Sequence, residues 1–560
     1  MNFSKNILAQ SITDLCYKKN IKNIVISPGS RNAPLVLGFN NNPFFKTYSV
    51  VDERVAAFFA LGIAQQIKEP VVLVCTSGSA LLNYYPAISE AYFSNIPLVI
   101  LSADRPKKFL NIGDGQTINQ KNVFQKNIEY SVDLDQKDKS FFSLLGLRLD
   151  NQIKINKALN ISITKQMPVH INVPFSEPLY DLTDSMLVHT TNILPKFNNS
   201  KVNRINSFTK KWQNSIKKII LIGVSSPGLL SKKSIDLLAS DSSVLVLIEN
   251  TSNVYHPFFC NKIDQLIAPL TDVELKDFKP EILITMGGMI ISKKIKVIFR
   301  NNQPKEHWHI GCQKANDTFF CLTKHFKSSP DDIIARLYEN FMDNTSDFNN
   351  RWTSVISKRK LKHEEYLSSL DYCDLKVFDI VLKSIPLKSM LQISNSSAIR
   401  YSQLFDIDSS INVFCNRGTS GIDGSTSTAI GASVTYNHNT VFITGDLSFF
   451  YDSNALWNDF IAVNFRIILI NNRGGGIFKI LTKDNNSEIF KKFFETKHQL
   501  SAKELCKMYG FEFYESDDES NLKSMLSDFY KPSKKPRLLE VIIDRENNQD
   551  YLLNYFDFIK

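Results

Sequence analysis

The sequence predicts an α/β protein built from three doubly wound, parallel-sheet domains. Short runs of Val, Ile and Leu recur along the chain, and most of them end in Gly, Ser, Asn or Asp, as buried parallel strands do. Longer helix-compatible segments separate these runs, which is the pattern of strand–helix–strand crossovers. A chain of 560 residues is also too long for a single hydrophobic core.

Two polar segments divide the chain into the three expected domains. Residues 185–210 and 342–350 are rich in Asn, Ser and Thr and have the composition of linkers. We therefore expect a first domain at residues 1–184, a central α/β domain at 185–345 and a third domain at 346–560. The first and third domains have a similar build, which suggests duplication, although no short-period repeat is visible.

Composition restricts the classes of function. Apolar content of 43% and charged content of 22% are typical of a globular protein, and no run is long enough to insert in a membrane. The N-terminus lacks the apolar block of a signal peptide, so a cytoplasmic protein is expected. The net charge of +10 comes from scattered Lys without a dense basic block, which disfavours nucleic-acid binding. The eight cysteines contain no CxxC pair and are expected as buried free thiols.

In the first domain, predicted strands end in residues suited to an anionic ligand. Strands are expected at 23–26, 71–75 and 98–101, with Arg31 after the first and Arg105 after the third. Parallel sheets place ligands at the carboxyl ends of their strands. Arginine holds carboxylates through two parallel hydrogen bonds, so these residues predict an anion site. The alternative is a set of ordinary loops punctuated by Gly, Ser and Pro.

A buried helix with a carboxylate at its start is predicted after these residues. Residues 55–64 are apolar on nearly every face, which places Glu53 at the helix N-terminus. Taken alone, Glu53 is better explained by a favourable interaction with the helix dipole, and only its combination with the stretch around Asp446 favours a functional role. The amide-rich loop 111–124 offers Gln116 as a hydrogen-bonding residue. The domain is expected to close with an edge strand and a proline-marked exit within residues 167–180.

The central domain shows no clear ligand signature. Strands are expected at 219–222, 244–248 and 282–285, and the glycines near them do not form a GxGxxG pattern. Dinucleotide binding, and with it a Rossmann dehydrogenase, is therefore disfavoured. Lys293 and Lys294 follow a glycine turn, and such a pair is more often solvated surface than part of a site.

The third domain again carries polar residues at predicted strand ends. Ser396 and Arg400 follow a strand expected at 390–393, and Arg417 follows one expected at 412–415.

The chemically most specific stretch follows. One predicted strand, 441–443, leads to Asp446, and the next, 466–470, leads to Asn472 and Gly474. A carboxylate, an amide oxygen and a carbonyl in a glycine turn form a hard oxygen site, which suits Mg²⁺ with a phosphorylated ligand. The alternative is an ordinary strand–helix–strand unit with polar loops.

Together these segments resemble thiamine-diphosphate enzymes, whose pyrimidine-binding and pyrophosphate-binding domains correspond to the first and third domains. More closely, the chain resembles the 2-succinyl-5-enolpyruvyl-6-hydroxy-3-cyclohexene-1-carboxylate synthases of menaquinone biosynthesis. The matching segments span nearly the whole chain in family order: ISPGSRNAPL (26–35), DERVAAFFALGIA (52–64), CTSGSALLNYYPAISEA (75–91), SADRP (102–106), GQTINQ (115–120), HINVPFSEPLY (170–180), NRGTSGIDGSTSTA (416–429), GDLSFFYDSNAL (445–456) and NNRGGGIF (471–478).

Four positions depart from the common patterns. Leu447 replaces the second Gly of the Gly-Asp-Gly motif of the class and matches the GDLS form of this family. Arg473 stands where a third Asn is usual, and Gly476 where a larger residue can occur. Lys294 stands where the family carries Arg beside the first lysine. We expect Asp446, Asn472 and the Gly474 carbonyl still to bind the metal, whereas the shape of the neighbouring pocket is not predicted.

The resemblance implies thiamine diphosphate with Mg²⁺, or Mn²⁺ in its place, in a site shared by two chains of a homodimer or tetramer. Asp446, Asn472 and the Gly474 carbonyl would bind the metal. Ile422 would press under the middle of the cofactor, and Glu53 of the partner subunit would hydrogen-bond its pyrimidine ring. The other cofactor-contacting residues implied are Asn395, Gly445, Leu447, Ile477 and Phe478.

The resemblance also implies a reaction: decarboxylation of 2-oxoglutarate and conjugate addition of the resulting succinyl-semialdehyde carbanion to isochorismate, with release of CO₂. Both substrates are polyanions, so cationic and hydrogen-bonding residues are needed. Those at matching positions are Arg31, Arg105, Arg400, Arg417, Lys293, Ser30, Gln116 and Ser396. The alternatives are another thiamine-diphosphate carboligase, a 2-oxo acid decarboxylase, or a non-catalytic binding protein of the same fold.

Overall fold

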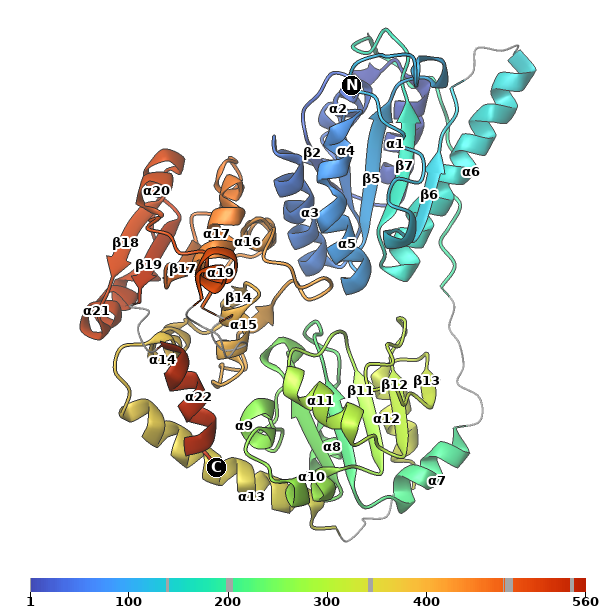
Figure 1. Ribbon diagram of the computed structural model, residues 1–560. Helices are drawn as coiled ribbons and strands as arrows, with labels where there is room; N and C mark the ends of the chain where they lie inside the picture. The colour runs from blue at the N-terminus through green and yellow to red at the C-terminus, as the bar shows by residue number, and fades with distance from the viewer. Residues whose placement is uncertain are drawn as a thin grey trace. The chain divides into compact units, whose positions relative to one another are not determined.

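A computed structural model describes the chain apart from residues 1, 137–140, 198–204, 341–345, 477, 479–486 and 544–547. The chain forms two compact units, whose helices and strands are labelled in Figure 1. The first consists of Met1–Asn198, Asn416–Asn437 and Ser448–Phe465, and the second of Asn199–Cys415, His438–Leu447 and Arg466–Lys560.

The first unit contains a six-stranded parallel sheet in the order β3-β2-β4-β5-β7-β6. Helices α1, α2 and α6 enclose one core with alternate residues of β2, β4, β5 and β7, while α3 and α5 lie on the other face (Figure 1). The strands are β2 (Asn23–Ile26), β3 (Lys46–Ser49), β4 (Val71–Cys75), β5 (Leu98–Asp104), β6 (Tyr130–Asp133) and β7 (Val169–Pro174), and the helices α1 (Ile7–Lys18), α2 (Ala33–Asn40), α3 (Glu53–Ile67), α4 (Ser79–Asn83), α5 (Tyr85–Ser94), α6 (Phe141–Lys165) and α16 (Ser425–Ser433). A small antiparallel pair joins β1 (Phe3–Ser4) to β8 (Leu182–Thr183).

One expectation for this sheet is wrong. The strand within residues 167–180, β7, is not an edge strand, because it pairs with β5 on one side and with β6 on the other. All of its residues are buried, as those of an interior parallel strand are. The edge is β6, a short, partly exposed strand that the sequence pattern did not reveal.

Helices α3 and α16 pack closely within the first unit because glycines stand where they approach. A Cβ atom added to Gly62 would lie 2.0 Å from the carbonyl oxygen of Thr428. One added to Gly431 would lie 2.0 Å from the carbonyl oxygen of Phe59. The buried helix predicted after Glu53 is confirmed, and it runs from Val55 to Gln65 without an exposed residue.

Gly62→Ala should therefore lower the free energy of unfolding by about 1–3 kcal/mol, because the methyl group meets backbone atoms that cannot rotate away. The thermal unfolding midpoint checks this expectation. Gly115→Ala is the matched control, since a Cβ atom there has no neighbour within 4 Å. Equal midpoints for the two variants would contradict the close packing of α3 and α16.

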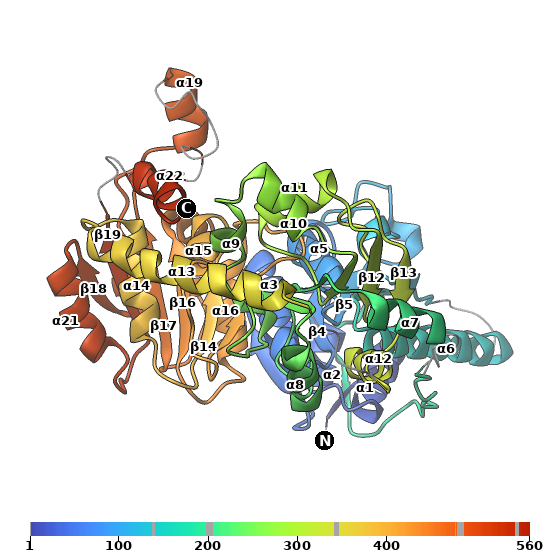
Figure 2. The same ribbon diagram turned by 90° about the horizontal axis from the view of Figure 1, so that it is seen from below.

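The second unit contains two parallel sheets, in the orders β10-β9-β11-β12-β13 and β15-β14-β16-β17-β19-β18 (Figure 2). Their strands are β9 (Lys218–Ile222), β10 (Val244–Ile248), β11 (Ile282–Met286), β12 (Glu306–Ile310), β13 (Lys324–Phe326), β14 (Met390–Ile393), β15 (Asn412–Phe414), β16 (Thr440–Gly445), β17 (Phe465–Asn471), β18 (Glu512–Ser516) and β19 (Arg537–Ile542). Their helices are α7 (Asn206–Asn214), α8 (Lys232–Ser240), α9 (Ile263–Ile267), α10 (Asp272–Phe278), α11 (Lys293–Asn301), α12 (Pro330–Leu337), α13 (Phe348–Ser368), α14 (Asp374–Ser384), α15 (Ser397–Ser402), α19 (Glu488–Phe490), α20 (Lys503–Tyr509), α21 (Glu519–Phe529) and α22 (Asn548–Phe558), and α17 (Asp446–Tyr451) begins directly after β16.

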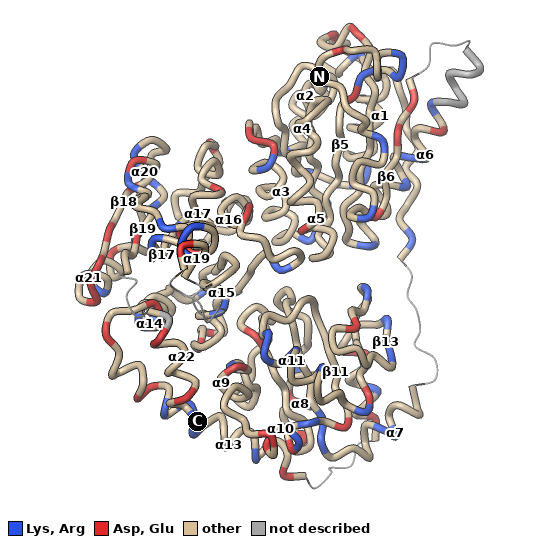
Figure 3. The backbone as a smooth tube through the Cα atoms, viewed as in Figure 1, with Lys and Arg blue, Asp and Glu red and all other residues tan. Residues whose placement is uncertain are grey.

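The predicted fold class is confirmed: the three large sheets are parallel and are covered by helices. Strands β16 and β17 are neighbours in the third sheet, as the strand–helix–strand interpretation required. The domain boundaries at 184/185 and 345/346 stay a prediction. Acidic and basic residues are interspersed along both units (Figure 3). Among the described helices, none has the length and apolar character needed to cross a bilayer.

Candidate functional site

A buried carboxylate meets a glycine turn at the carboxyl ends of β16 and β17. Asp446 is the first residue after β16, and its side chain is 5% exposed. Its Oδ2 atom accepts the backbone N–H of Gly474 at 2.7 Å, and the Nε2 atom of His498 lies 3.1 Å from the same oxygen. Its Oδ1 atom accepts the backbone N–H of Leu447 at 2.6 Å. Two residues predicted as metal ligands, Asp446 and Gly474, are thus brought together.

The glycine turn has an unusual backbone. Arg473 has a φ of +60° and Gly474 a φ of +135°, so the second position in particular favours glycine. The Oδ1 atom of Asn471 accepts the N–H of Arg473 at 3.0 Å, which stabilises the turn. Asn472 donates its amide N–H to Asp374 at 3.3 Å. Positive φ at non-glycine residues is costly and concentrates at functional sites, which fits a turn shaped for a ligand.

The oxygen atoms of this turn suit a hard cation. Asp446 offers a carboxylate, Asn472 an amide oxygen and Gly474 a backbone carbonyl, which are donor types that Mg²⁺ accepts. Among the described residues, no cluster of three or more His, Cys, Asp or Glu side chains could hold a metal. A metal bound by these three residues would have one carboxylate and two neutral oxygens as ligands, a donor set that suits Mg²⁺ or Mn²⁺ better than the softer transition metals.

The remaining predicted cofactor residues of the second unit lie near these strand ends in the sequence. Asn395, just after β14, is buried and accepts a hydrogen bond from the Sγ atom of Cys415 at 3.4 Å. The N–H of Gly445 donates to Ser394 at 3.4 Å. Phe478 packs edge-on against Phe494 with ring centroids 5.7 Å apart. Ile477 lies outside the described residues.

Glu53 and Ile422 belong to the first unit. Glu53 is the first residue of α3, and Asp52 caps this helix by accepting the N–H of Val55 at 3.1 Å. The carboxylate of Glu53 accepts a hydrogen bond from the amide of Asn83 at 3.4 Å and is partly exposed. The side chain of Ile422 is exposed, at 38%. Both side chains are therefore accessible to a ligand.

Two arginines of the first unit already contact carboxylates. Arg31 lies 3.1 Å from Glu177 and donates to the carbonyl of Phe175 at 3.0 Å. Arg105 lies 3.6 Å from Asp114 and donates to the carbonyl of Gly115 at 3.1 Å. The carboxylate partners are exposed, 68% for Glu177 and 38% for Asp114. Exposed ion pairs of this kind are weak, so an anionic ligand can replace these partners.

The loop that carries Gln116 is fixed by a residue the sequence interpretation missed. Gln116 itself has a φ of +55° and packs against Gly78. Gln120 is buried, accepts the N–H of Gly78 at 2.9 Å and donates to Asn172 at 2.8 Å. It therefore links the loop to the ends of β4 and β7. Its place at the end of the matching segment 115–120 was the available signal.

A second missed residue, Glu90, holds the loop that carries Arg417. Glu90 is buried on α5, and its carboxylate accepts the N–H groups of Gly418 and Thr419, each at 2.7 Å. Ser94 donates to the same carboxylate at 2.7 Å. A carboxylate that accepts several hydrogen bonds tolerates burial. A lone Glu within an apolar helix was the only sequence signal for this role.

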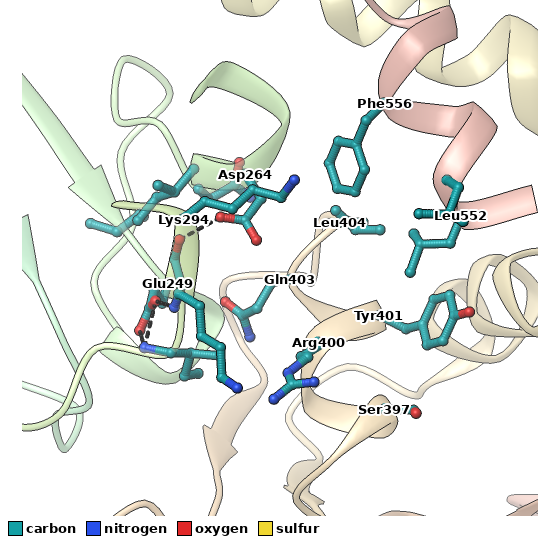
Figure 4. Close-up of a pocket in the computed structure, with 17 residues that line it drawn as sticks. Glu249, Asp264, Lys294, Ser397, Arg400, Tyr401, Gln403, Leu404, Leu552 and Phe556 are labelled. Carbon is teal, nitrogen blue, oxygen red and sulfur yellow. Dashed lines mark hydrogen bonds between the residues drawn. The ribbon is translucent and has the colours of Figure 1, made fainter. Parts of the chain in front are cut away.

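A cavity of about 340 Å³ in the second unit brings Lys293, Lys294 and Arg400 together (Figure 4). Figure 4 shows Arg400 and Gln403 pointing toward the elements that carry Glu249 and Lys294. The other side of the cavity is apolar and includes Leu552 and Phe556 of α22. The lysine pair, which could have been ordinary surface, thus lines a cavity with a predicted substrate arginine.

Charges around this cavity are partly compensated. Glu249 is buried and accepts the N–H groups of Ile291 and Ser292, at 2.8 Å each. Burial raises the pKa of Asp264, and the charges of Lys294 and Arg400 oppose that shift. The ammonium of Lys294 lies 4.2 Å from the ring centroid of Phe556. Ser396, just before α15, has a φ of +71° and so joins Gln116 among the candidate substrate residues with a strained backbone.

Comparison with known proteins gives concordant matches. Residues 7–132 match the family described as "Thiamine pyrophosphate enzyme, N-terminal TPP binding domain". A curated protein of Flavobacterium psychrophilum is 50% identical over 99% of both chains, and one of Christiangramia forsetii is 48% identical over 100% of both. A protein of Porphyromonas gingivalis is 33% identical over 98% of this chain and 96% of its own. All three are named 2-succinyl-5-enolpyruvyl-6-hydroxy-3-cyclohexene-1-carboxylate synthase.

Proposed function

The chain belongs to the 2-succinyl-5-enolpyruvyl-6-hydroxy-3-cyclohexene-1-carboxylate synthase family of thiamine-diphosphate enzymes, and we propose that it catalyses the reaction for which this family is named. In this reaction 2-oxoglutarate loses CO₂ and its remaining four-carbon unit is added to isochorismate, a step of menaquinone biosynthesis. The observation that carries the proposal is near-50% identity over the full length of relatives with that name. The contact of Asp446 with the glycine turn supports it.

We assign the metal and cofactor contacts as follows. Asp446, Asn472 and the Gly474 carbonyl would hold Mg²⁺ with the diphosphate of the cofactor, and Ile422 would support the middle of the cofactor. When bound, thiamine diphosphate supplies the carbanion chemistry for decarboxylation and carbon–carbon bond formation. Glu53, contributed by the partner subunit of a homodimer or tetramer, would hold and exchange a proton at the pyrimidine ring nitrogen. Only an ionisable group can perform that exchange, which explains a carboxylate at this position.

The cationic residues bind the substrate carboxylates. Arg31 and Arg105 exchange their contacts with exposed carboxylates of this chain for contacts with substrate. Arg400 and Lys293 line one cavity. The loop that carries Arg417 is held in place by a hydrogen bond from the N–H of Gly418 to the buried carboxylate of Glu90. The guanidinium group of arginine holds a carboxylate through two parallel hydrogen bonds in a fixed geometry. Such orientation is needed to present first the keto carbon of 2-oxoglutarate and then the ring alkene of isochorismate. Ser30, Gln116 and Ser396 complete the set as hydrogen-bonding residues.

Incubation with 2-oxoglutarate, isochorismate, thiamine diphosphate and Mg²⁺ tests the proposal. Loss of isochorismate absorbance should require all four components and should be matched by release of CO₂. CO₂ release without loss of isochorismate would favour a simple 2-oxo acid decarboxylase. Loss of neither substrate would favour a non-catalytic protein of the same fold.

A further inference from the structure

We propose that His498 is a positioning residue of the metal site, which orients Asp446 for Mg²⁺ and does not itself bind the ion. This inference rests on the proposed function, because it concerns how the chain prepares its own residues for the metal. The contact that motivates it is the 3.1 Å distance between His498 Nε2 and Asp446 Oδ2. His498 comes from a segment that none of the recognised motifs includes.

The hydrogen bond at Nδ1 of His498 determines which ring nitrogen carries the proton in the neutral ring. The backbone N–H of Leu500 donates to Nδ1 at 3.1 Å, so Nδ1 is an acceptor. In the neutral ring the proton then resides on Nε2, which donates it to Asp446. A protonated nitrogen has no lone pair for a metal, whereas a hydrogen bond to the carboxylate fixes the orientation of that carboxylate. The geometry therefore favours an orienting role over ligation.

The side chain of His498 and the backbone N–H of Gly474 contact the same oxygen, Oδ2 of Asp446, at 3.1 and 2.7 Å. The side chains of His498 and Asp446 are largely buried, 12% and 5% exposed. Two donors on one oxygen restrict rotation of the carboxylate. Hydrogen bonds to ionised groups are among the stronger ones in proteins, particularly away from water.

The segment around His498 is tied to the glycine turn by the backbone. Gly475 donates its N–H to the carbonyl of Glu495 at 2.7 Å, and His498 donates its own N–H to the carbonyl of Arg473 at 3.3 Å. The side chain of Asn471 donates to the carbonyl of Leu500 at 3.0 Å. Residues 495–500 and 471–475 thus form one hydrogen-bonded pair of loops, which positions the imidazole over Asp446.

A buried carboxylate anchors both loops. Glu540, on β19, is completely buried and accepts the side-chain N–H of Asn471 at 2.6 Å. Its other oxygen accepts the hydroxyl of Ser501 at 2.6 Å and the N–H of Ala502 at 3.1 Å. Since Asn471 also accepts the N–H of Arg473, Glu540 connects the metal turn with the segment that carries His498. A buried carboxylate that accepts these three hydrogen bonds fixes the orientation of both loops.

A Mg²⁺ titration of thiamine-diphosphate binding tests the inference. Calorimetry at fixed thiamine diphosphate should give an Mg²⁺ midpoint about 10–100-fold higher for His498→Ala than for the natural protein, the usual effect of removing an outer hydrogen bond to a metal ligand. His498→Gln retains an N–H donor at a similar distance and should restore most of the affinity. Gln499→Ala, at the exposed neighbouring position, is the control and should leave the midpoint unchanged.

Each other outcome overturns the inference in a distinguishable way. An unchanged midpoint in His498→Ala, even with a lower unfolding temperature, would show a merely structural role. A lower midpoint would show that His498 competes with the metal. Equal, large losses in His498→Ala and His498→Gln would indicate that the ring itself is a ligand. If the natural protein showed no Mg²⁺-dependent binding of thiamine diphosphate, the proposed function would fail first and the inference with it.

Discussion

Glu53→Gln should leave the fold and cofactor binding intact and lower kcat by about 10²–10⁴-fold, the range that proton-transfer groups contribute. The amide keeps the size of the side chain and its ability to hydrogen-bond, but it cannot exchange a proton with the pyrimidine ring. Glu53 is partly exposed, and Asp52 caps the helix, so little stability depends on the carboxylate. Steady-state kinetics and calorimetry with thiamine diphosphate separate the two effects.

Glu69→Gln is the matched control for this variant. Glu69 is exposed just beyond the other end of α3, so its substitution should change neither kcat nor cofactor affinity. Full activity of Glu53→Gln would remove Glu53 from the mechanism. A loss of thiamine-diphosphate affinity as large as the loss of kcat would assign it to binding rather than to proton exchange.

Asp446→Ala should abolish Mg²⁺-dependent binding of thiamine diphosphate, with a loss of affinity above about 100-fold, since even outer contacts to metal ligands contribute up to that factor. The substitution removes the only carboxylate proposed as a metal ligand. It also leaves the N–H groups of Gly474 and His498 without this acceptor. Calorimetry with and without Mg²⁺ measures the effect.

Asp459→Ala, at an exposed position between α17 and β17, is the control and should bind the cofactor normally. Tight, Mg²⁺-dependent binding by Asp446→Ala would refute the metal site at the ends of β16 and β17. Circular dichroism of the variant distinguishes loss of the metal site from loss of the fold.

Much of the fold could be predicted because interior parallel strands are continuous apolar runs. The strands β2, β4, β10 and β14 begin and end where the sequence placed them. Strand β6 was missed because Tyr130–Asp133 is short and partly polar, and each of its residues is partly exposed. Because β6 was not predicted, β7 was interpreted as the edge strand of the sheet. Its complete burial is typical of an interior strand.

The residues of the candidate site could likewise be predicted only in part from the sequence. Residues that follow strands, such as Asp446 and Arg400, could be found locally, because topology alone brings strand ends to one edge. Glu90, His498 and Glu540 could not, because each acts on a loop distant in sequence through hydrogen bonds that only the folded chain forms. The meeting of Lys293 with Arg400 in one cavity likewise depends on tertiary contacts between segments that are far apart in the sequence.

Co-expression of Glu53→Gln and Asp446→Ala chains carrying different tags tests the account most directly. If Glu53 and Asp446 from different chains complete one cofactor site, each mixed dimer contains one intact site, and purified mixed dimers should regain about half of the natural activity. Mixed dimers of Asp446→Ala and Asn472→Ala are the control and should stay inactive, because both defects affect the same half-site. Inactive mixed dimers of Glu53→Gln and Asp446→Ala would contradict a thiamine-diphosphate site shared between these two residues.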